Sequence, residues 1–201
     1  MTPKTAKRAS RSADTAPIRA FKDAEAWDSW LVKNQTAADG IWMRIARKSS
    51  GVKSVTYAEA VEVALCHGWI DGQKRPESET TWLQRFVPRR PRSIWSKINR
   101  EKALALIAGG RMKPAGLAEI ERAKKDGRWD AAYASFSSAT MPDDLQAALE
   151  KRPKAKAFFK TLTRTNAYAI LWRIHTAKKP ETRERRIQSY VEMLEKGETL
   201  H

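Results

Sequence analysis

The chain has 201 residues, one cysteine, 41% hydrophobic residues and a formal net charge of +16. This length and apolar content are enough for a packed core, and one cysteine excludes an internal disulfide framework, which favours the reducing cytoplasm. No run approaches the eighteen or so apolar residues of a membrane span, and the N-terminus lacks the apolar segment of a secretory signal. We therefore expect a cytoplasmic protein whose charge attracts anionic partners.

The first segment, residues 1–19, is basic, rich in Ser, Thr, Ala and Pro, and without hydrophobic periodicity. This composition predicts a disordered tail. Its five bases and one acid give the tail a net charge of +4, which leaves +12 on residues 20–201. The charge is therefore spread over the part that we expect to fold as a single domain.

Helix and strand patterns alternate after the tail. Residues 23–34 have the apolar spacing of an amphipathic helix. Residues 41–48 alternate as a half-buried strand, and the segments 69–75 and 81–87 also have strand patterns. These three segments predict a small antiparallel sheet of about three strands.

A second helix is predicted over residues 54–68, SVTYAEAVEVALCHG. Thr56 and Glu59 have the spacing of a capping box, in which side chain and backbone satisfy each other at the helix start. Gly68 is placed to end the helix in the left-handed conformation. This stretch is the best-defined helix of the N-terminal half.

From residue 93 onward the patterns are helical. Ser93 is placed to cap a helix, and prolines suit the first turns of several others. We predict helices over 93–109, from Pro114, from Pro142, from Pro153, over 165–178 and over 180–196. The predicted fold class is α+β: a small antiparallel sheet with helices, followed by a helical C-terminal half, with lobes at 20–91 and 92–201 as the finer division.

The stretch CHGWIDGQKR (66–75) places Cys66, His67 and Asp71 close together in sequence. Neighbouring helical residues do not face each other, so Cys66 and His67 cannot form a thiol–imidazole pair. The C-terminal end of a helix and the nearby Glu62 both oppose a thiolate. We therefore assign no catalytic residue here, and only Asp71 keeps a claim to a functional role.

The most unusual segment is WLQRFVPRRPRSIWSKINREK (82–102), which is basic and has a tryptophan near each end. Guanidinium groups next to indole rings suit phosphate or single-strand binding, because bases stack on aromatic rings while Arg follows the backbone. If about five phosphates were contacted, the log–log salt slope would be about −3.5. The predicted anion-binding or nucleic-acid-binding residues are Lys74, Arg75, Trp82, Arg85, Arg89, Arg90, Arg92, Trp95, Lys97 and Arg100.

Two other interpretations of these residues stay open. The bases can form a solvated connection between two halves, with both tryptophans in the core. Alternatively, Trp69, Asp71 and Trp82 line a cleft for a small ligand or a substrate. The sequence has no metal-binding or nucleotide-binding motif, so we predict no metal and no cofactor. Whether the protein is an enzyme stays open, with a binding protein favoured.

Five blocks occur in order along the chain: AWDSWLVKNQTAADGIWMRIARKSSG, SVTYAEAVEVALCHGWIDGQKR, WLQRFVPRRPRSIWSKINREK, GRMKPAGLAEIERAKKDGRWDAAY and AKKPETRERRIQSYVEMLEKG. Together they resemble a known bacterial family, the YdeI/OmpD-associated or bacteriocin-protection family. The resemblance extends over roughly residues 21–198. It implies a small cytosolic α+β protein with a role in stress or in resistance to bacteriocins and cationic peptides, and it transfers no catalytic residue.

Overall fold

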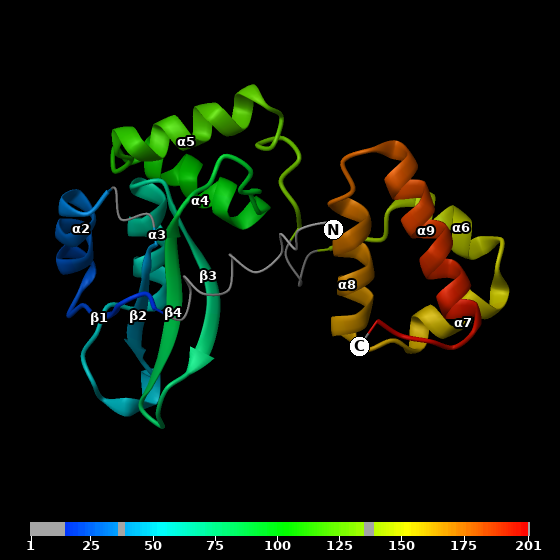
Figure 1. Cartoon of the computed structure of the whole chain (residues 1–201), viewed down its shortest axis with the longest axis horizontal. Coiled ribbons are helices and arrows are strands. Elements are labelled where there is room, and N and C mark those ends of the chain that lie inside the picture. Colours follow the sequence, from blue (N-terminus) through cyan, green and yellow to red (C-terminus); the bar gives the residue numbers. More distant parts are fainter. Residues whose placement is uncertain (1–14, 36–38, 135–138, 201) are drawn as a thin grey trace, which may run out of the picture. The chain divides into compact units, whose positions relative to one another are not determined.

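The computed structural model of the chain describes residues 15–35, 39–134 and 139–200. Its helices and strands divide into two compact units, which we describe separately as unit 1 and unit 2 (Figure 1). Unit 1 comprises Met1–Trp95 and Asn99–Asp130, and unit 2 comprises Ser96–Ile98 and Ala131–His201.

Unit 1 contains a four-stranded sheet with the strand order β1-β2-β4-β3 (Figure 1). Strands β2 and β3 each run antiparallel to β4, whereas β1 runs parallel to β2. The predicted sheet of about three strands therefore lacked β1, because three residues are too few to show an alternating pattern. The strands are β1 (Ile18–Ala20), β2 (Ile41–Ala46), β3 (Trp69–Pro76) and β4 (Thr81–Pro88).

The predicted N-terminal tail, residues 1–19, is described only from residue 15 onward, and residues 1–14 lie outside the described part of the chain. Residues 18 and 19 belong to β1 and pair with Trp42 and Met43 of β2. Strand β1 therefore begins at residue 18, before the predicted end of the tail at residue 19. The pairing with β2 outweighs the local composition, which by itself gives no sign of a strand.

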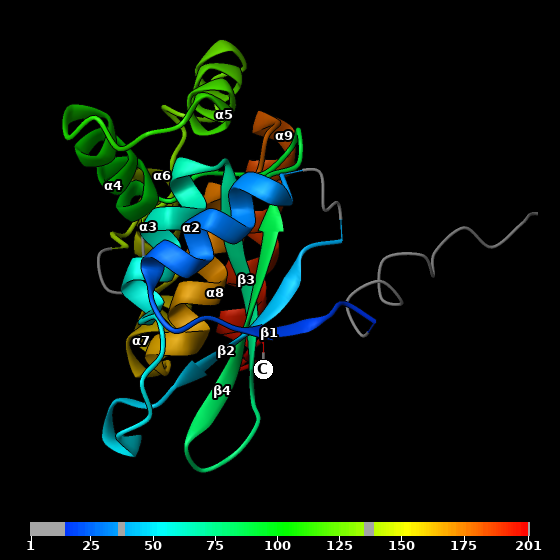
Figure 2. The same ribbon diagram turned by 90° about the vertical axis from the view of Figure 1, so that its left-hand side faces the viewer.

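Helices α2 and α3 lie side by side against one face of this sheet (Figure 2). Residues 23–34 and 54–68 were the predicted ranges, so both helices are confirmed with slightly shorter bounds. The helices of unit 1 are α2 (Ala24–Lys33), α3 (Tyr57–Cys66), α4 (Lys97–Ala108, the first two residues of which belong to unit 2) and α5 (Pro114–Lys125), and Lys48–Ser50 forms one 3-10 turn.

The ends of α3 have the predicted signals. Thr56 and Glu59 form the full capping box. Gly68 has a φ of 73°, which a residue with a side chain rarely adopts. A Cβ on Gly116 of α5 would lie 2.4 Å from the carbonyl oxygen of Cys66, so only glycine allows α5 to pack this closely on the end of α3.

The predicted start of α4 at Ser93 is wrong, because the helix begins at Lys97. The Ser93 hydroxyl instead accepts a hydrogen bond from the Arg90 backbone N–H at 2.9 Å, and the Ser93 N–H donates to the Arg90 carbonyl oxygen at 2.9 Å. Ser93 therefore closes a turn and does not cap the helix.

The centre of unit 1 is an aromatic cluster between α2 and the sheet. The Trp27 indole is fully buried, and its Nε1–H donates to the Ala60 carbonyl oxygen at 3.1 Å, which ties α2 to α3. A buried indole with a satisfied N–H contributes both apolar area and a fixed orientation. The members of the cluster, with ring centroids 5.0–6.0 Å apart, are Phe21, Trp27, Trp30, Trp69 and Phe86.

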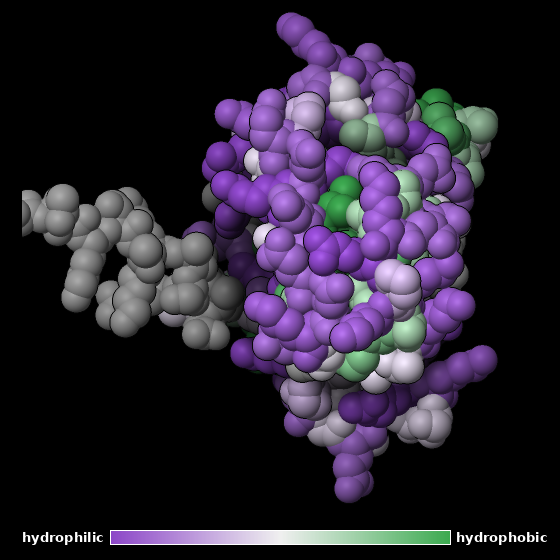
Figure 3. All heavy atoms as spheres, turned by 90° about the vertical axis from the view of Figure 1, so that its right-hand side faces the viewer, coloured by the Kyte–Doolittle hydropathy of each residue, from purple (hydrophilic) through white to green (hydrophobic). Residues whose placement is uncertain are grey.

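Unit 2 is helical in its described part, as the sequence predicts for the C-terminal half. Helix α9 contacts each of the other three, and their apolar faces form one core. One face of this unit is mostly hydrophilic with a smaller group of apolar side chains near its centre (Figure 3). The helices are α6 (Asp143–Glu150), α7 (Pro153–Thr161), α8 (Arg164–His175) and α9 (Pro180–Glu195).

The fold is therefore α+β, as predicted, with a mixed sheet in place of an antiparallel one. Over the described residues, no helix has the length and apolar content needed to cross a lipid bilayer.

Candidate anion-binding site

The basic segment 82–102 is divided between the core and the surface of the protein. Arg85 is only 5% exposed, and its guanidinium donates a hydrogen bond to the Asp39 carbonyl oxygen and lies 5.7 Å from the Trp42 ring centroid. Burial lowers the pKa of Arg85, with the Asp39 charge opposing that change. Arg85 is thus a structural cation on the sheet face opposite α3, although the sequence predicts it at the binding surface.

Arg89 and Trp95 form a second buried contact. The guanidinium carbon lies 3.5 Å from the indole ring centroid, and Nη1 donates to the Ile94 carbonyl oxygen at 3.2 Å. Trp95 is 2% exposed and meets Trp129 edge-on at a centroid distance of 4.8 Å. These side chains have little surface to offer a ligand, so they belong to the core of unit 1.

Four other predicted residues are exposed or partly buried in the turn after β4 and in α4. Arg90 and Arg92 are exposed in the turn that Ser93 closes. Arg100 is partly buried in α4 and donates to the Trp129 carbonyl oxygen at 3.2 Å. Lys97 is exposed at the start of α4 and is assigned to unit 2.

Lys74, Arg75 and Trp82 are brought together at one end of the sheet. They line a hollow of about 350 Å³ with Arg47 and Pro76. The β3–β4 register places Pro76 opposite Trp82, and the Arg47 backbone N–H donates to the Thr80 carbonyl oxygen at 2.8 Å, which brings the end of β2 to the same place. We call this site the basic hollow. Of the ten residues predicted to bind an anion, Lys74, Arg75 and Trp82 are the three that line this hollow.

The cations of the basic hollow have no carboxylate partner within the described part of the chain, in contrast to their neighbour Arg44, which pairs with Glu77 at 2.6 Å. That pairing raises the pKa of Arg44 through the hydrogen bond to Glu77. Arg75 instead stacks on Trp42, with its guanidinium carbon 4.3 Å from the ring centroid. The three cations of the basic hollow thus form no ion pair within the described residues, although the Glu77 charge acts on Arg75, and they lie beside a partly buried indole, that of Trp82.

The alternative cleft around Trp69, Asp71 and Trp82 is not assembled as one surface. Trp69 is 1% exposed and meets Trp27 and Trp30 in the aromatic cluster. The Asp71 carboxylate accepts a hydrogen bond from the Tyr57 hydroxyl at 2.6 Å. Asp71 is therefore held by α3, while the Trp69 ring lies in the core.

Cys66, His67 and Asp71 each have a separate environment. Burial raises the pKa of the Cys66 thiol, with Arg111 and Lys113 opposing and Asp28 and Glu62 adding to the change, so the predicted direction is right but desolvation is the main cause. His67 is buried, and its Nε2 lies 2.8 Å from an Asp28 carboxylate oxygen. No nucleophile–base contact links the three residues.

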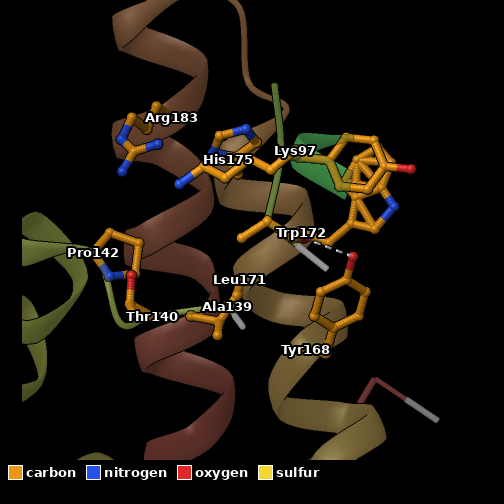
Figure 4. A pocket seen from close by; sticks show the side chains of 11 residues that line it. Lys97, Ala139, Thr140, Pro142, Tyr168, Leu171, Trp172, His175 and Arg183 are labelled. Atoms are coloured by element: carbon orange, nitrogen blue, oxygen red, sulfur yellow. Dashed lines mark hydrogen bonds between the residues drawn. The ribbon is translucent and has the colours of Figure 1, made fainter. Parts of the chain in front are cut away.

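A second pocket lies within unit 2 and was not predicted from the sequence (Figure 4). Lys97 is its only lining residue that the sequence predicts to bind anions. The sequence analysis missed Tyr133, Trp172 and Arg183. Tyr133 is about 40 residues from Trp172, and Trp172 is about 10 residues from Arg183, so no local pattern links them. The sequence assigns no role to His175, because the three histidines of the chain lack the spacing of metal ligands. Among residues 15–35, 39–134 and 139–200, no three His, Cys, Asp or Glu side chains are grouped to hold a metal ion.

Two family models match different parts of the chain. Residues 19–119, just over half of the chain, match the family described as Domain of unknown function (DUF8412). Residues 138–197 match the family described as Bacteriocin-protection, YdeI or OmpD-Associated. The resemblance seen in the sequence is therefore confirmed for the C-terminal helices, whereas the N-terminal blocks fall under the first model. No curated protein and no solved structure matches the chain.

Proposed function

We propose that this chain, which belongs to the family described as Domain of unknown function (DUF8412) and carries a Bacteriocin-protection, YdeI or OmpD-Associated region, is a non-enzymatic cytoplasmic protein that binds a phosphate-bearing polymer. Single-stranded nucleic acid is the first candidate. The description of the C-terminal family associates that region with bacteriocin protection and so with stress resistance. A chain of net charge +16 repels cationic peptides, so protection would act through the anionic partner.

The observation that supports this proposal is the basic hollow. Three cations without ion-pair partners in the described residues line this hollow together with the partly buried Trp82. A nucleobase stacked on an exposed indole contributes about 1–3 kcal/mol, and this contact tolerates any base. Arg47, Lys74 and Arg75 lie around the same hollow, where they can neutralise successive phosphates of the same strand.

The burial of Arg85, Arg89 and Trp95 reduces the expected number of phosphate contacts. If the basic hollow neutralises about three phosphates, the log–log salt slope for a single strand is about −2, and not the −3.5 expected for about five. The measurement is fluorescence anisotropy of a labelled oligothymidylate over a salt series. A flat salt response, or no binding at about 50 mM salt, would overturn the proposal.

The matched test removes the cations of the basic hollow. The triple variant Arg47→Ala, Lys74→Ala, Arg75→Ala is expected to bind the oligonucleotide at least tenfold more weakly and to have a salt slope near zero. The control variant Lys154→Ala, Lys160→Ala, Lys178→Ala removes the same charge from exposed positions of unit 2 that have no ion pair in the described residues. An equal loss in both variants would mean that only net charge matters, which contradicts a site at the hollow.

A further inference from the structure

The second pocket, of about 220 Å³, lies wholly within unit 2. Figure 4 shows Lys97, His175 and Arg183 toward one end of it, Tyr168 toward the other, and Leu171 and Ala139 between them. Helices α8 and α9 supply most of the long side chains, α4 supplies Lys97, and the segments around Tyr133 and Pro142 complete the lining. It thus combines a cationic end with an apolar and aromatic wall, which is the usual composition of a small-molecule site.

The aromatic side of this pocket is held by several contacts. The Tyr133 and Trp172 rings are stacked, with centroids 5.4 Å apart and an angle of 8° between their planes. The Lys97 backbone N–H donates to the Tyr133 carbonyl oxygen at 2.8 Å, which fixes the start of the lysine side chain beside this pair. The Tyr168 hydroxyl donates to the Ala134 carbonyl oxygen at 3.3 Å. The wall is therefore in place before any ligand binds.

The charges at the cationic end are not equivalent. Arg183 donates two hydrogen bonds to the Asp144 carboxylate, one of them at 2.9 Å, so its charge is largely compensated. His175 Nε2 lies 3.3 Å from the Ala131 carbonyl oxygen. Lys97 is exposed and has no ion pair or side-chain hydrogen bond within the described ranges. Its ammonium is thus the charge that an incoming anion can pair with.

We propose that this pocket binds a small anion with a single planar ring, whose carboxylate or phosphate pairs with Lys97 while the ring packs on the apolar and aromatic wall. The volume lies below the range of about 300–1,000 Å³ typical of sites for drug-sized ligands, which favours a one-ring compound. This site is separate from the basic hollow of unit 1, and it stands whether or not the chain binds nucleic acid.

The test uses the full chain and two-dimensional NMR of the tryptophan indole N–H groups. The signal of Trp172, assigned by its loss in Trp172→Phe, is expected to shift and saturate on titration with benzoate. Benzamide has the same ring without the charge and is expected to bind about tenfold more weakly, because a hydrogen bond to a charged group is worth more than a neutral one. A third titration with phenyl phosphate shows which anion the pocket prefers. Equal binding of benzoate and benzamide, or no shift of the Trp172 signal by any of the three compounds, would overturn the proposal.

The contribution of the lysine is tested by Lys97→Met, which keeps the length of the side chain and removes its charge. We expect about tenfold weaker binding of benzoate and little change for benzamide. Lys160→Met, at an exposed position of α7 outside the pocket, is the matched control and should bind like the unaltered protein. Unchanged benzoate affinity in Lys97→Met, with the indole spectrum otherwise intact, would contradict the assignment of Lys97.

Discussion

The interior of unit 1 and the pocket of unit 2 place a tryptophan and its neighbouring cation in different settings. In unit 1, the Arg89 guanidinium carbon lies 3.5 Å from the Trp95 ring centroid in the interior, and both side chains are almost fully buried. In unit 2, Trp172 and Tyr133 stack at the edge of a pocket, with Lys97 beside them. The segment richest in Arg and Trp is therefore partly core, and a more dispersed set of residues lines a hollow. Abundance of these residue types in the sequence does not indicate their availability to a ligand.

Arg and Trp side chains can be buried together because the face of an indole ring attracts a guanidinium inside the protein as well as at its surface. A desolvated cation–π contact is worth about 2 kcal/mol or more, compared with about 0.5–1 kcal/mol at exposed sites. Arg89 also donates to the Ile94 carbonyl oxygen, so part of its polarity is met locally. Proximity of Arg and Trp in sequence is therefore compatible with both a binding surface and a stabilising core contact.

The largest expected effect separates the two tryptophans that flank the basic segment. Trp95→Ala is expected to lower the free energy of unfolding of unit 1 by about 3–5 kcal/mol, because it leaves a cavity beside Trp129. Trp82→Ala removes a half-exposed ring from the basic hollow and should cost clearly less. Urea titration followed by the indole NMR signal of Trp27 reports on unit 1. Similar losses in both variants would break the distinction between the core and the basic hollow.

A smaller effect distinguishes two adjacent arginines. Arg89→Ala removes the contact with Trp95 and the hydrogen bond to Ile94, and we expect a loss of about 2–3 kcal/mol in the free energy of unfolding. Arg90→Ala alters an exposed side chain and should stay within about 0.5 kcal/mol. The same urea titration measures both variants. If Arg89→Ala were as mild as Arg90→Ala, the buried cation–π contact would not stabilise unit 1.

The smallest expected effect concerns Arg183 of unit 2, which forms an ion pair with Asp144. The hydrogen bonds from Arg183 lower the pKa of Asp144 below its ordinary value. The stabilisation from this pair is therefore complete at neutral pH and is lost as the pH falls through the lowered pKa. Asp144→Asn should lower the free energy of unfolding by no more than about 1 kcal/mol at pH 7, since the pair is partly exposed. It should also make the loss of stability at acidic pH smaller.

The measurement for Asp144→Asn is the melting temperature of unit 2 between neutral and acidic pH, followed by the Trp172 indole signal. The neighbouring exposed residue provides the control, because Asp143→Asn removes a carboxylate that has no ion pair in the described residues. Identical pH profiles for the two variants would show that the pair with Arg183 contributes nothing specific.

Local signals in the sequence predicted much of the fold. The period of apolar residues gave α2, α3 and strands β2 to β4, and the Thr56–Glu59 spacing gave the capping box. Strand β1 could not be predicted, because it is specified by pairing with β2 and has only three residues. The start of α4 was placed too early, since a serine that suits a helix cap suits a turn equally well.

The candidate sites depended far more on contacts between distant residues. Whether Arg89 is buried depends on Trp95 and Trp129, which meet only after the chain has folded. Lys74 is exposed and Arg75 partly exposed on the β3–β4 hairpin, but Arg47 joined them only through strand pairing. The pocket of unit 2 combines four separated segments, namely Lys97, lining residues between 133 and 142, α8 and α9, so no short sequence pattern marks it.

The central claim is that the basic hollow, and not the whole Arg- and Trp-rich segment, binds the anionic polymer. The most direct measurement compares two double variants that remove the same charge, Lys74→Ala with Arg75→Ala and Arg90→Ala with Arg92→Ala. At about 50 mM salt, the first pair is expected to raise the Kd for oligothymidylate about tenfold, and the second by less than about twofold. Equal losses, or a larger loss for Arg90 and Arg92, would contradict the claim.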